Sequence, residues 1–282
     1  MRKGIALLIT IFFVIAITLS IGLGFRYIKD AKESVSDEQF ILQTSTVVED
    51  LLTILKDSQQ LKDIKDAQNL STFLAESSFI PLNYKDTQIT IEISSARAKL
   101  NLNIFKNKER LDVLKSYFQS NMIVVEFADI LTDSMNGIKE DLSYKSDIFN
   151  NNPTLFRNYI TSYEHLDKLN QIYKNKYHDN HIKNIEIDKL FFLSKDSDTK
   201  VDLNFVTSEV WEFMLGCSAL KAEALSANNG SYKTIEDLNL NDAERKMLNK
   251  FKYSFYEPYL NIKLTISQNK KHQTIEFSYD LI

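Results

Sequence analysis

Residues 89–105 read ITIEISSARAKLNLNIF, and this stretch predicts a strand, a turn and the start of a helix. Ile89, Ile91 and Ile93 alternate with polar residues, which is the pattern of a strand with one buried face. A polar turn follows, and Leu100-Asn101-Leu102-Asn103 then leads into a helical segment. Asn103 is placed to cap or turn the chain before that helix.

A second stretch, FFLSKDSDTKVDLNFVTSEVWEFML at residues 191–215, has the same order of features, with Asn204 in the place of Asn103. Two helix starts also look alike, TSYEHL at 161–166 and KTIEDL at 233–238. Thr161 with Glu164 has the spacing of a capping box, and Thr234 with Asp237 is a looser version. Taken singly, each of these segments is also explained by an ordinary turn before a helix.

The C-terminal segment predicts a hairpin with one buried face. Leu260, Ile262, Leu264 and Ile266 alternate with polar residues, residues 268–271 form a turn, and a second alternation follows at Ile275, Phe277, Tyr279 and Leu281. Residues 106–190 are mostly helical in pattern, with a buried stripe expected at Leu111, Leu114, Phe118, Met122, Val125 and Ile130.

This order predicts an α+β fold with a small antiparallel sheet formed by residues 61–105 and 255–282. A large all-α domain, residues 106–254, is inserted into that sheet.

The N-terminal residues 5–25 carry no charge and are long enough to cross a hydrocarbon core of about 30 Å as a helix. A signal peptide fits less well, because its apolar stretch is about 7–15 residues long and a small-residue cleavage site follows it. Arg2 and Lys3 precede the run, which predicts a short cytoplasmic N-terminus, an inner-membrane anchor and a periplasmic C-terminal domain.

Residues 26–60 predict an amphipathic continuation of the same helix. The apolar residues fall near helical spacing, at Phe40, Val47, Val48, Leu51, Leu52 and Leu55.

The composition argues against several functional classes. The formal charge of −4 over 282 residues offers nucleic acid no broad basic face. A single cysteine, Cys217, excludes an intramolecular disulfide and a cysteine-rich metal site.

No nucleophile-elbow or phosphate-loop motif occurs, so we predict that the protein is not an enzyme. The one close histidine pair, His178 and His181, lies in a polar segment and is interpreted as surface residues. We expect Trp211 to lie in the core and Cys217 to be a buried thiol.

A short basic leader that ends in Gly4 before an apolar helix resembles the type IV pilin and pseudopilin superfamily. The resemblance implies that a prepilin peptidase cuts between Gly4 and Ile5 and that Ile5 is then methylated. Most members carry Glu at the fifth mature position, where this chain has Ile9. A subunit at the tip has no neighbour ahead whose amino group such a Glu would meet, so Ile9 fits a tip position.

The order of motifs is similar to that of the minor pseudopilin K family of type II secretion, also called general secretion pathway protein K. Four phrases carry the resemblance: Lys99–Asn103, Val201–Thr207, Ser162–Leu166 and Thr234–Leu238. The family's function implies a cap at the tip of the periplasmic pseudopilus that helps to initiate its assembly for protein export across the outer membrane. The implied partners are other minor pseudopilins, the major pseudopilin, the prepilin peptidase, the inner-membrane assembly platform and, through residues 5–25, membrane lipid.

The family also carries an acidic stretch, D-W-I-D-x-D followed by E-D-x-Y. Here the corresponding residues are Asp133, Asn136, Glu140 and Asp141, followed by Tyr144, with the Trp absent and Asn136 in place of one Asp. Asp133, Asn136, Glu140 and Asp141 are candidate calcium ligands, since calcium needs six to eight oxygen donors. A solvated acidic turn is the alternative.

Two other functions stay open from the sequence. One is a minor pilin of a type IV pilus or a competence filament. The other is a membrane-anchored sensor or adhesin ectodomain, which predicts no cleavage after Gly4.

Overall fold

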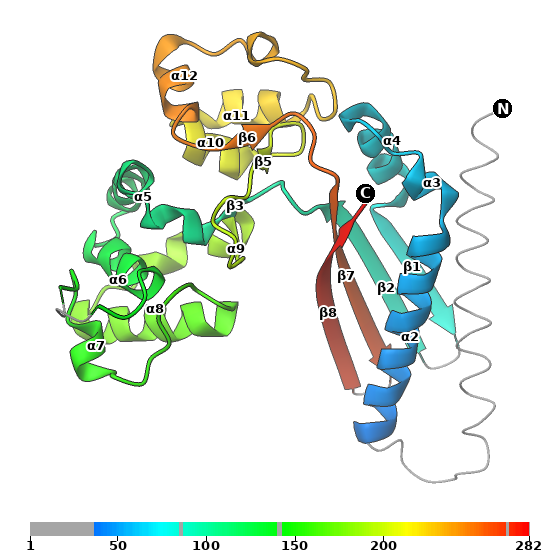
Figure 1. The fold of residues 1–282 in the computed structure, drawn as a ribbon, viewed down its shortest axis with the longest axis horizontal. Helices are drawn as coiled ribbons and strands as arrows, with labels where there is room; N and C mark the ends of the chain where they lie inside the picture. The colour runs from blue at the N-terminus through cyan, green and yellow to red at the C-terminus, as the bar shows by residue number, and fades with distance from the viewer. Residues whose placement is uncertain (1–36, 85–86, 140–142, 269–270, 282) are drawn as a thin grey trace. The chain divides into compact units, whose positions relative to one another are not determined.

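The computed structural model describes residues 37–84, 87–139, 143–268 and 271–281, which form two compact units (Figure 1). The sheet unit contains the described residues up to Ala96 and from Pro258, and the helical unit spans Arg97–Glu257. The predicted leader 1–4, membrane helix 5–25 and residues 26–36 lie outside the described residues. None of the helices within the described ranges combines the length and apolar character of a membrane span.

The sheet unit is built on four antiparallel strands in the order β1-β2-β7-β8. They are β1 Phe79–Tyr84, β2 Thr87–Ser95, β7 Tyr259–Gln268 and β8 Lys271–Asp280. Ile91 pairs with Leu264, and Leu264 pairs with Ile275, so the alternating apolar residues fall on one face. The predicted strands around Ile91 and Leu264 are confirmed, whereas β1 had not been predicted.

The apolar side chains of β8 are less covered than the sequence predicts. Leu260, Ile262 and Leu264 of β7 are fully buried. Ile275, Phe277 and Tyr279 of β8 are only half-buried. β8 lies at the edge of the sheet, so a neighbouring strand covers these residues on one side only.

In the part of the chain that the structure describes, three helices precede the sheet: α2 Asp37–Asp57, α3 Gln59–Lys62 and α4 Ala67–Ser77. Figure 1 shows α2 lying along one face of the sheet. Phe40, Leu51 and Leu55 of α2 are buried, as predicted. Leu52 is 39% exposed, so its predicted place in the buried stripe is wrong. Leu51 and Leu55 lie four residues apart on the buried face of the helix, and Leu52 lies on a neighbouring face.

The inserted unit is mainly helical but not all-α as predicted. Two pairs of two-residue parallel strands join distant segments, β3 Leu100–Asn101 with β4 Phe191–Phe192 and β5 Val201–Asp202 with β6 Tyr253–Ser254. The other elements are η1 Leu102–Lys106, α5 Lys108–Ser120, α6 Glu126–Met135, α7 Ile148–Asn151, α8 Tyr163–Tyr177, η2 His181–Asn184, α9 Ile187–Leu190, α10 Ser208–Leu215, α11 Ala219–Ser226, η3 Ile235–Leu238 and α12 Asp242–Leu248.

The helical unit begins at Arg97 and ends at Glu257, whereas the predicted insertion ran from 106 to 254. The reason lies in the Leu-Asn-Leu-Asn phrase. Leu100, Leu102 and Phe105 are buried in the hydrophobic core of the helical unit rather than under the sheet.

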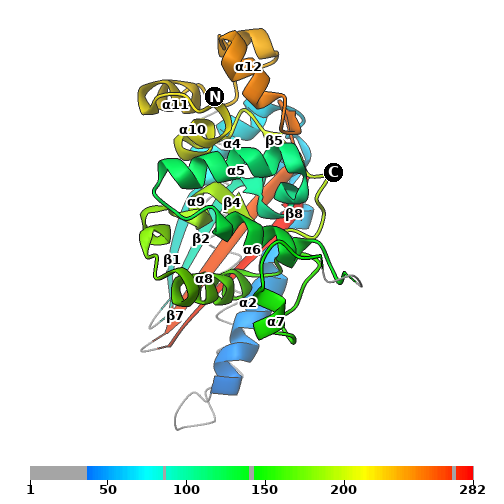
Figure 2. The ribbon, with the colours of Figure 1, turned by 90° about the vertical axis from the view of Figure 1, so that its left-hand side faces the viewer.

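Within the helical unit, α6 lies between α5 and α8 (Figure 2). The ring of Phe127 on α6 lies 5.4 Å from that of Phe118 on α5 and 4.8 Å from that of Tyr173 on α8. These ring contacts tie three segments of the chain into one core.

The predicted stripe of this unit is confirmed at Leu111, Leu114, Phe118 and Ile130, which are all buried. It is wrong at Met122, which is 74% exposed, while Ile123 is buried instead. The helix ends at Ser120, and Met122 has a left-handed φ of 61°, so the helical spacing stops before this residue. Val125 is half-buried.

Candidate functional site

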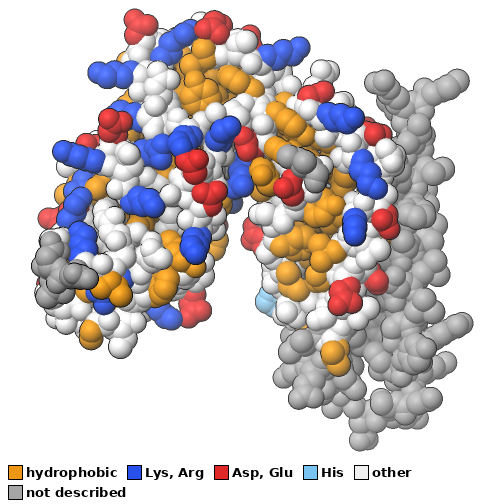
Figure 3. Space-filling model, in the orientation of Figure 1, with side chains coloured by type: hydrophobic (Ala, Val, Ile, Leu, Met, Phe, Trp, Pro, Cys, Tyr) orange, Lys and Arg blue, Asp and Glu red, His pale blue; other side chains and the backbone are white. Residues whose placement is uncertain are grey.

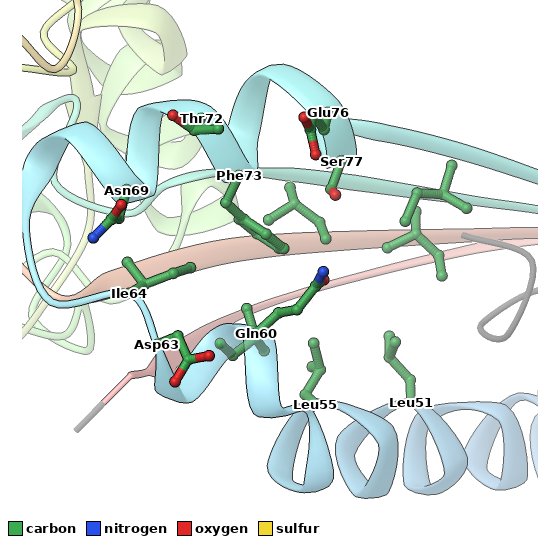
Figure 4. Close-up of a pocket in the computed structure, with 14 residues that line it drawn as sticks. Leu51, Leu55, Gln60, Asp63, Ile64, Asn69, Thr72, Phe73, Glu76 and Ser77 are labelled. Atoms are coloured by element: carbon green, nitrogen blue, oxygen red, sulfur yellow. The ribbon is translucent and has the colours of Figure 1, made fainter. Parts of the chain in front are cut away.

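A groove in the sheet unit encloses a cavity of about 220 Å³. Leu51 and Leu55 of α2 form one wall, and Ile91 and Ile93 of β2 form part of the floor. Figure 4 shows Phe73 pointing from α4 into the space between the two helices. An apolar cavity of about 150 Å³ is large enough to bind benzene, so this groove has room for an apolar side chain.

Helix α4 builds the second wall because its start is fixed by a local cap. The carboxylate of Asp66 accepts a hydrogen bond from the backbone N–H of Asn69 at 2.8 Å. Leu70 on the same helix is fully buried, and Phe73 is half-buried. Helix α4 was not predicted, although Asp66 followed by apolar residues at 67, 70, 73 and 74 is the signal for a capped amphipathic helix.

The rim of the groove is polar, and the charged side chains that the described residues place there are all acidic. It consists of Gln60, Asp63, Asn69, Thr72, Glu76 and Ser77. The nearby cations Lys56, Lys62 and Lys65 are not among the residues that line the groove. The arrangement is therefore an apolar cavity behind an acidic rim.

The acidic segment proposed to bind calcium is only partly described, because Glu140 and Asp141 lie outside the described residues. Asp133 is fully buried, and its carboxylate accepts hydrogen bonds from Lys145 N at 3.0 Å, Ser146 N at 2.6 Å and Ser146 Oγ at 2.8 Å. Asp133 therefore holds the segment around Lys145 and Ser146 against α6.

Asn136 is exposed at the end of α6. With the oxygens of Asp133 engaged by protein donors, these two residues alone do not supply the six to eight oxygens that calcium needs.

The hydroxyl group of Tyr144, which follows the acidic segment, is hydrogen-bonded to residues on both sides of it in the sequence. This oxygen accepts hydrogen bonds from Lys139 N at 2.9 Å and from Arg157 Nη1 at 3.0 Å. The Arg157 guanidinium also lies 4.1 Å from the centre of the Phe149 ring. These contacts give Tyr144 a structural role.

The two similar helix starts are capped differently from the prediction. Helix α8 is capped by Ser162, whose hydroxyl accepts from His165 N at 3.1 Å, and not by Thr161. Thr234 with Asp237, the looser match in the sequence, does form a capping box: the Asp237 carboxylate accepts from Thr234 N at 2.8 Å.

Asn103 and Asn204 do not cap the following helices, which begin after Asn107 and Thr207. Both asparagines are instead buried.

The histidine pair is split by the end of α8. His178 ends the helix with a left-handed φ of 52°, while the His181 ring Nδ1 lies 2.6 Å from Asp179 Oδ1. Burial acts to raise the pKa of Asp179, but hydrogen bonds from the Tyr173 hydroxyl and the backbone N–H groups of His181 and Val124 outweigh it and lower the pKa to about 2. Among the described residues, no three His, Cys, Asp or Glu side chains are grouped to hold a metal ion.

Trp211 is fully buried, as predicted. Cys217 is half-buried, with its Sγ 3.9 Å from the carbonyl oxygen of Trp211. Burial raises the pKa of the Cys217 thiol, which keeps it in the less reactive protonated form.

The fold is shared with a chain in the crystal structure of the GspK-GspI-GspJ complex from the enterotoxigenic Escherichia coli type 2 secretion system. The TM-score is 0.59 at 15% sequence identity, over 86% of this chain and 91% of that chain. No protein-family model matches the sequence, and no curated protein does. The predicted resemblance to a type II secretion pseudopilin is thus confirmed in the fold.

Proposed function

We propose that this protein is the K-type minor pseudopilin of a type II secretion system, that it caps the tip of the periplasmic pseudopilus and that it helps to initiate assembly. The observation that carries this proposal is the extent of the shared fold, 86% of this chain and 91% of the similar one. That coverage exceeds either unit alone, so the match includes the sheet unit and the inserted helical unit.

The proposed partners are minor pseudopilins equivalent to GspI and GspJ, which accompany the similar chain in its complex. Residues 5–25 would anchor the protein in the inner membrane beside the equally apolar helices of these partners, where close packing holds helices together. The described units would stand in the periplasm. The protein would act by assembly and not by catalysis.

The tip position is supported by two features of this chain. Ile9 lacks the carboxylate with which most pilin-like subunits meet the amino group of a neighbour. The helical unit, Arg97–Glu257, adds a second compact unit to the part of the protein proposed to lie in the periplasm. A subunit with that bulk suits a place where no further subunit stacks above it.

Labelling of the filament tests this proposal. An epitope inserted after Asn229, in the turn that follows α11, is expected to mark one end of each pseudopilus under electron microscopy. The same full-length protein should co-purify with the other minor pseudopilins of its system. Label spaced along the whole filament would overturn the tip position, and a chain that binds none of the minor pseudopilins would overturn the proposed function.

A further inference from the structure

We propose that the groove between α2 and α4 is the docking site for an aliphatic side chain, flanked by Lys or Arg, from a neighbouring minor pseudopilin. This inference rests on the proposed function and deepens it, since it assigns a surface of the sheet unit to the partner. All the described residues that line the groove belong to that unit.

The shape of the groove suits one anchor side chain. The apolar part of its lining, around a cavity of about 220 Å³, consists of aliphatic residues and the Phe73 ring, and Leu51, Ile91 and Ile93 close its inner side. Figure 4 shows the side chain of Gln60 reaching across the space at the end near α3. In protein interfaces a few residues packed into desolvated pockets carry most of the binding energy.

The charge of the rim selects the flanking residues of the partner. Asp63 and Glu76 are both exposed, and among the described residues they are the only charged ones that line the groove. Asp63 Oδ1 accepts a hydrogen bond from Gln59 Nε2 at 3.1 Å, which holds this carboxylate in place without neutralising it. A partner with Lys or Arg beside its anchor is attracted to such a rim, and an acidic partner or a fatty-acid carboxylate is repelled.

Other apolar side chains of the sheet unit are partly exposed as well. Figure 3 shows hydrophobic side chains gathered on the surface of the sheet unit. Ile275, Phe277 and Tyr279 of the edge strand β8 are half-buried in the same unit. The sheet unit thus exposes apolar surface outside the groove too, and apolar surface forms the core of protein interfaces.

A pair of tryptophan substitutions on α4 tests the site in the full-length protein. Thr72 lines the groove and Ala75 does not, although both are exposed on the same helix. In complexes purified with the partner minor pseudopilins, Thr72→Trp is expected to weaken association by about tenfold or more, because its ring covers the opening. Ala75→Trp should leave the affinity unchanged, and thermal unfolding of both variants checks the fold.

Charge reversal tests the rim independently. Glu76→Lys is expected to weaken association several-fold at low salt and less at high salt, since salt screens exposed charges. Glu49→Lys provides the control, because Glu49 is exposed on α2 and does not line the groove. Equal effects of the two reversals would show a general charge effect and would contradict the proposed rim.

Photo-crosslinking identifies the occupant. A benzoylphenylalanine at position 72 in cells is expected to crosslink to a minor pseudopilin, at a peptide with an aliphatic residue beside Lys or Arg, whereas position 75 should not. A crosslink to lipid, or to a second copy of this chain, would overturn the inference. If wild-type complexes form and Thr72→Trp has no effect, the groove assignment fails while the proposed function stands; if wild type forms no complex, both fail.

Discussion

Asn103 and Asn204 lie 101 positions apart in the sequence and make equivalent sets of three side-chain hydrogen bonds in the core of the helical unit. Asn103 accepts from Ile160 N at 2.7 Å and donates to Ile160 O at 3.1 Å and to Ser194 O at 3.0 Å. Asn204 accepts from Tyr232 N at 2.8 Å and donates to Tyr232 O at 2.8 Å and to Phe255 O at 2.6 Å.

Ile160 and Tyr232 each stand two residues before the N-cap of a helix, Ser162 and Thr234. The two phrases and the two helix starts that look alike in the sequence are therefore joined pairwise in space. Each asparagine holds the backbone that leads into one of those helices.

Asn103→Ala and Asn204→Ala should each destabilise the helical unit by about 1–3 kcal/mol, because buried backbone groups lose their partners. The fluorescence of Trp211 during denaturant unfolding measures this, since the only tryptophan lies in the core of that unit. Asn107→Ala removes an exposed cap of α5 and should cost about 1 kcal/mol. Losses for Asn103 and Asn204 no larger than this control would contradict their assigned role.

Asp202 should make the stability of the helical unit depend on pH. It is fully buried and accepts from Asn204 N at 3.0 Å and Glu257 N at 2.8 Å, and burial raises its pKa to about 6. The folded state thus holds the proton more tightly than the unfolded state, whose Asp pKa is about 3.9. The free energy of unfolding is expected to fall by about 1–3 kcal/mol as the pH rises from about 4 through about 6.

Asp202→Asn should remove this slope, as seen in the difference between the unfolding curves of variant and wild type across that pH range. Asn101, which holds the equivalent place in the first phrase, shows that an amide fits such a turn: its Oδ1 accepts from Asn103 N at 3.1 Å. Asp198→Asn is the control. The hydrogen bond from Lys252 lowers the pKa of Asp198, so its contribution to the free energy of unfolding rises with pH, opposite in sign to that of Asp202. An unchanged slope in Asp202→Asn would contradict the assignment.

Asp133→Ala should lower the melting temperature of the helical unit even in a chelator, because Lys145 N and Ser146 N lose their acceptor. Asp141→Ala tests the calcium site separately from this structural role of Asp133. If the acidic segment binds the ion, millimolar calcium should raise the melting temperature and Asp141→Ala should abolish the rise. Wild type that does not respond to calcium would leave Asp133 as a structural anchor only.

Co-expression with a prepilin peptidase should remove residues 1–4 and leave Ile5 methylated at its amino group, as measured by intact mass spectrometry. Gly4→Val should block the cut, because a branched side chain does not fit where the enzyme needs a bare backbone. An intact Met1 in the presence of active peptidase would favour the ordinary membrane anchor.

The sequence by itself determined the elements whose pattern depends on near neighbours in the chain. The period-two alternation at Ile89–Ile93 and Leu260–Ile266 fixed two central strands, since the wrong register would turn their apolar side chains to water. Phe40, Leu51 and Leu55 fixed the buried stripe of α2, and the order of segments revealed an insertion. These patterns need no knowledge of what packs against them.

The tertiary structure alone decided the roles that depend on distant partners. Asn103 has the local signature of a cap, yet its partners Ile160 and Ser194 lie far along the chain, and a buried amide is most stable where all its hydrogen bonds are made. Met122 fits a helical stripe, but its left-handed turn exposes it. The groove exists only because α4 packs against β2 while a space remains between α2 and α4, and no local pattern specifies a space between elements.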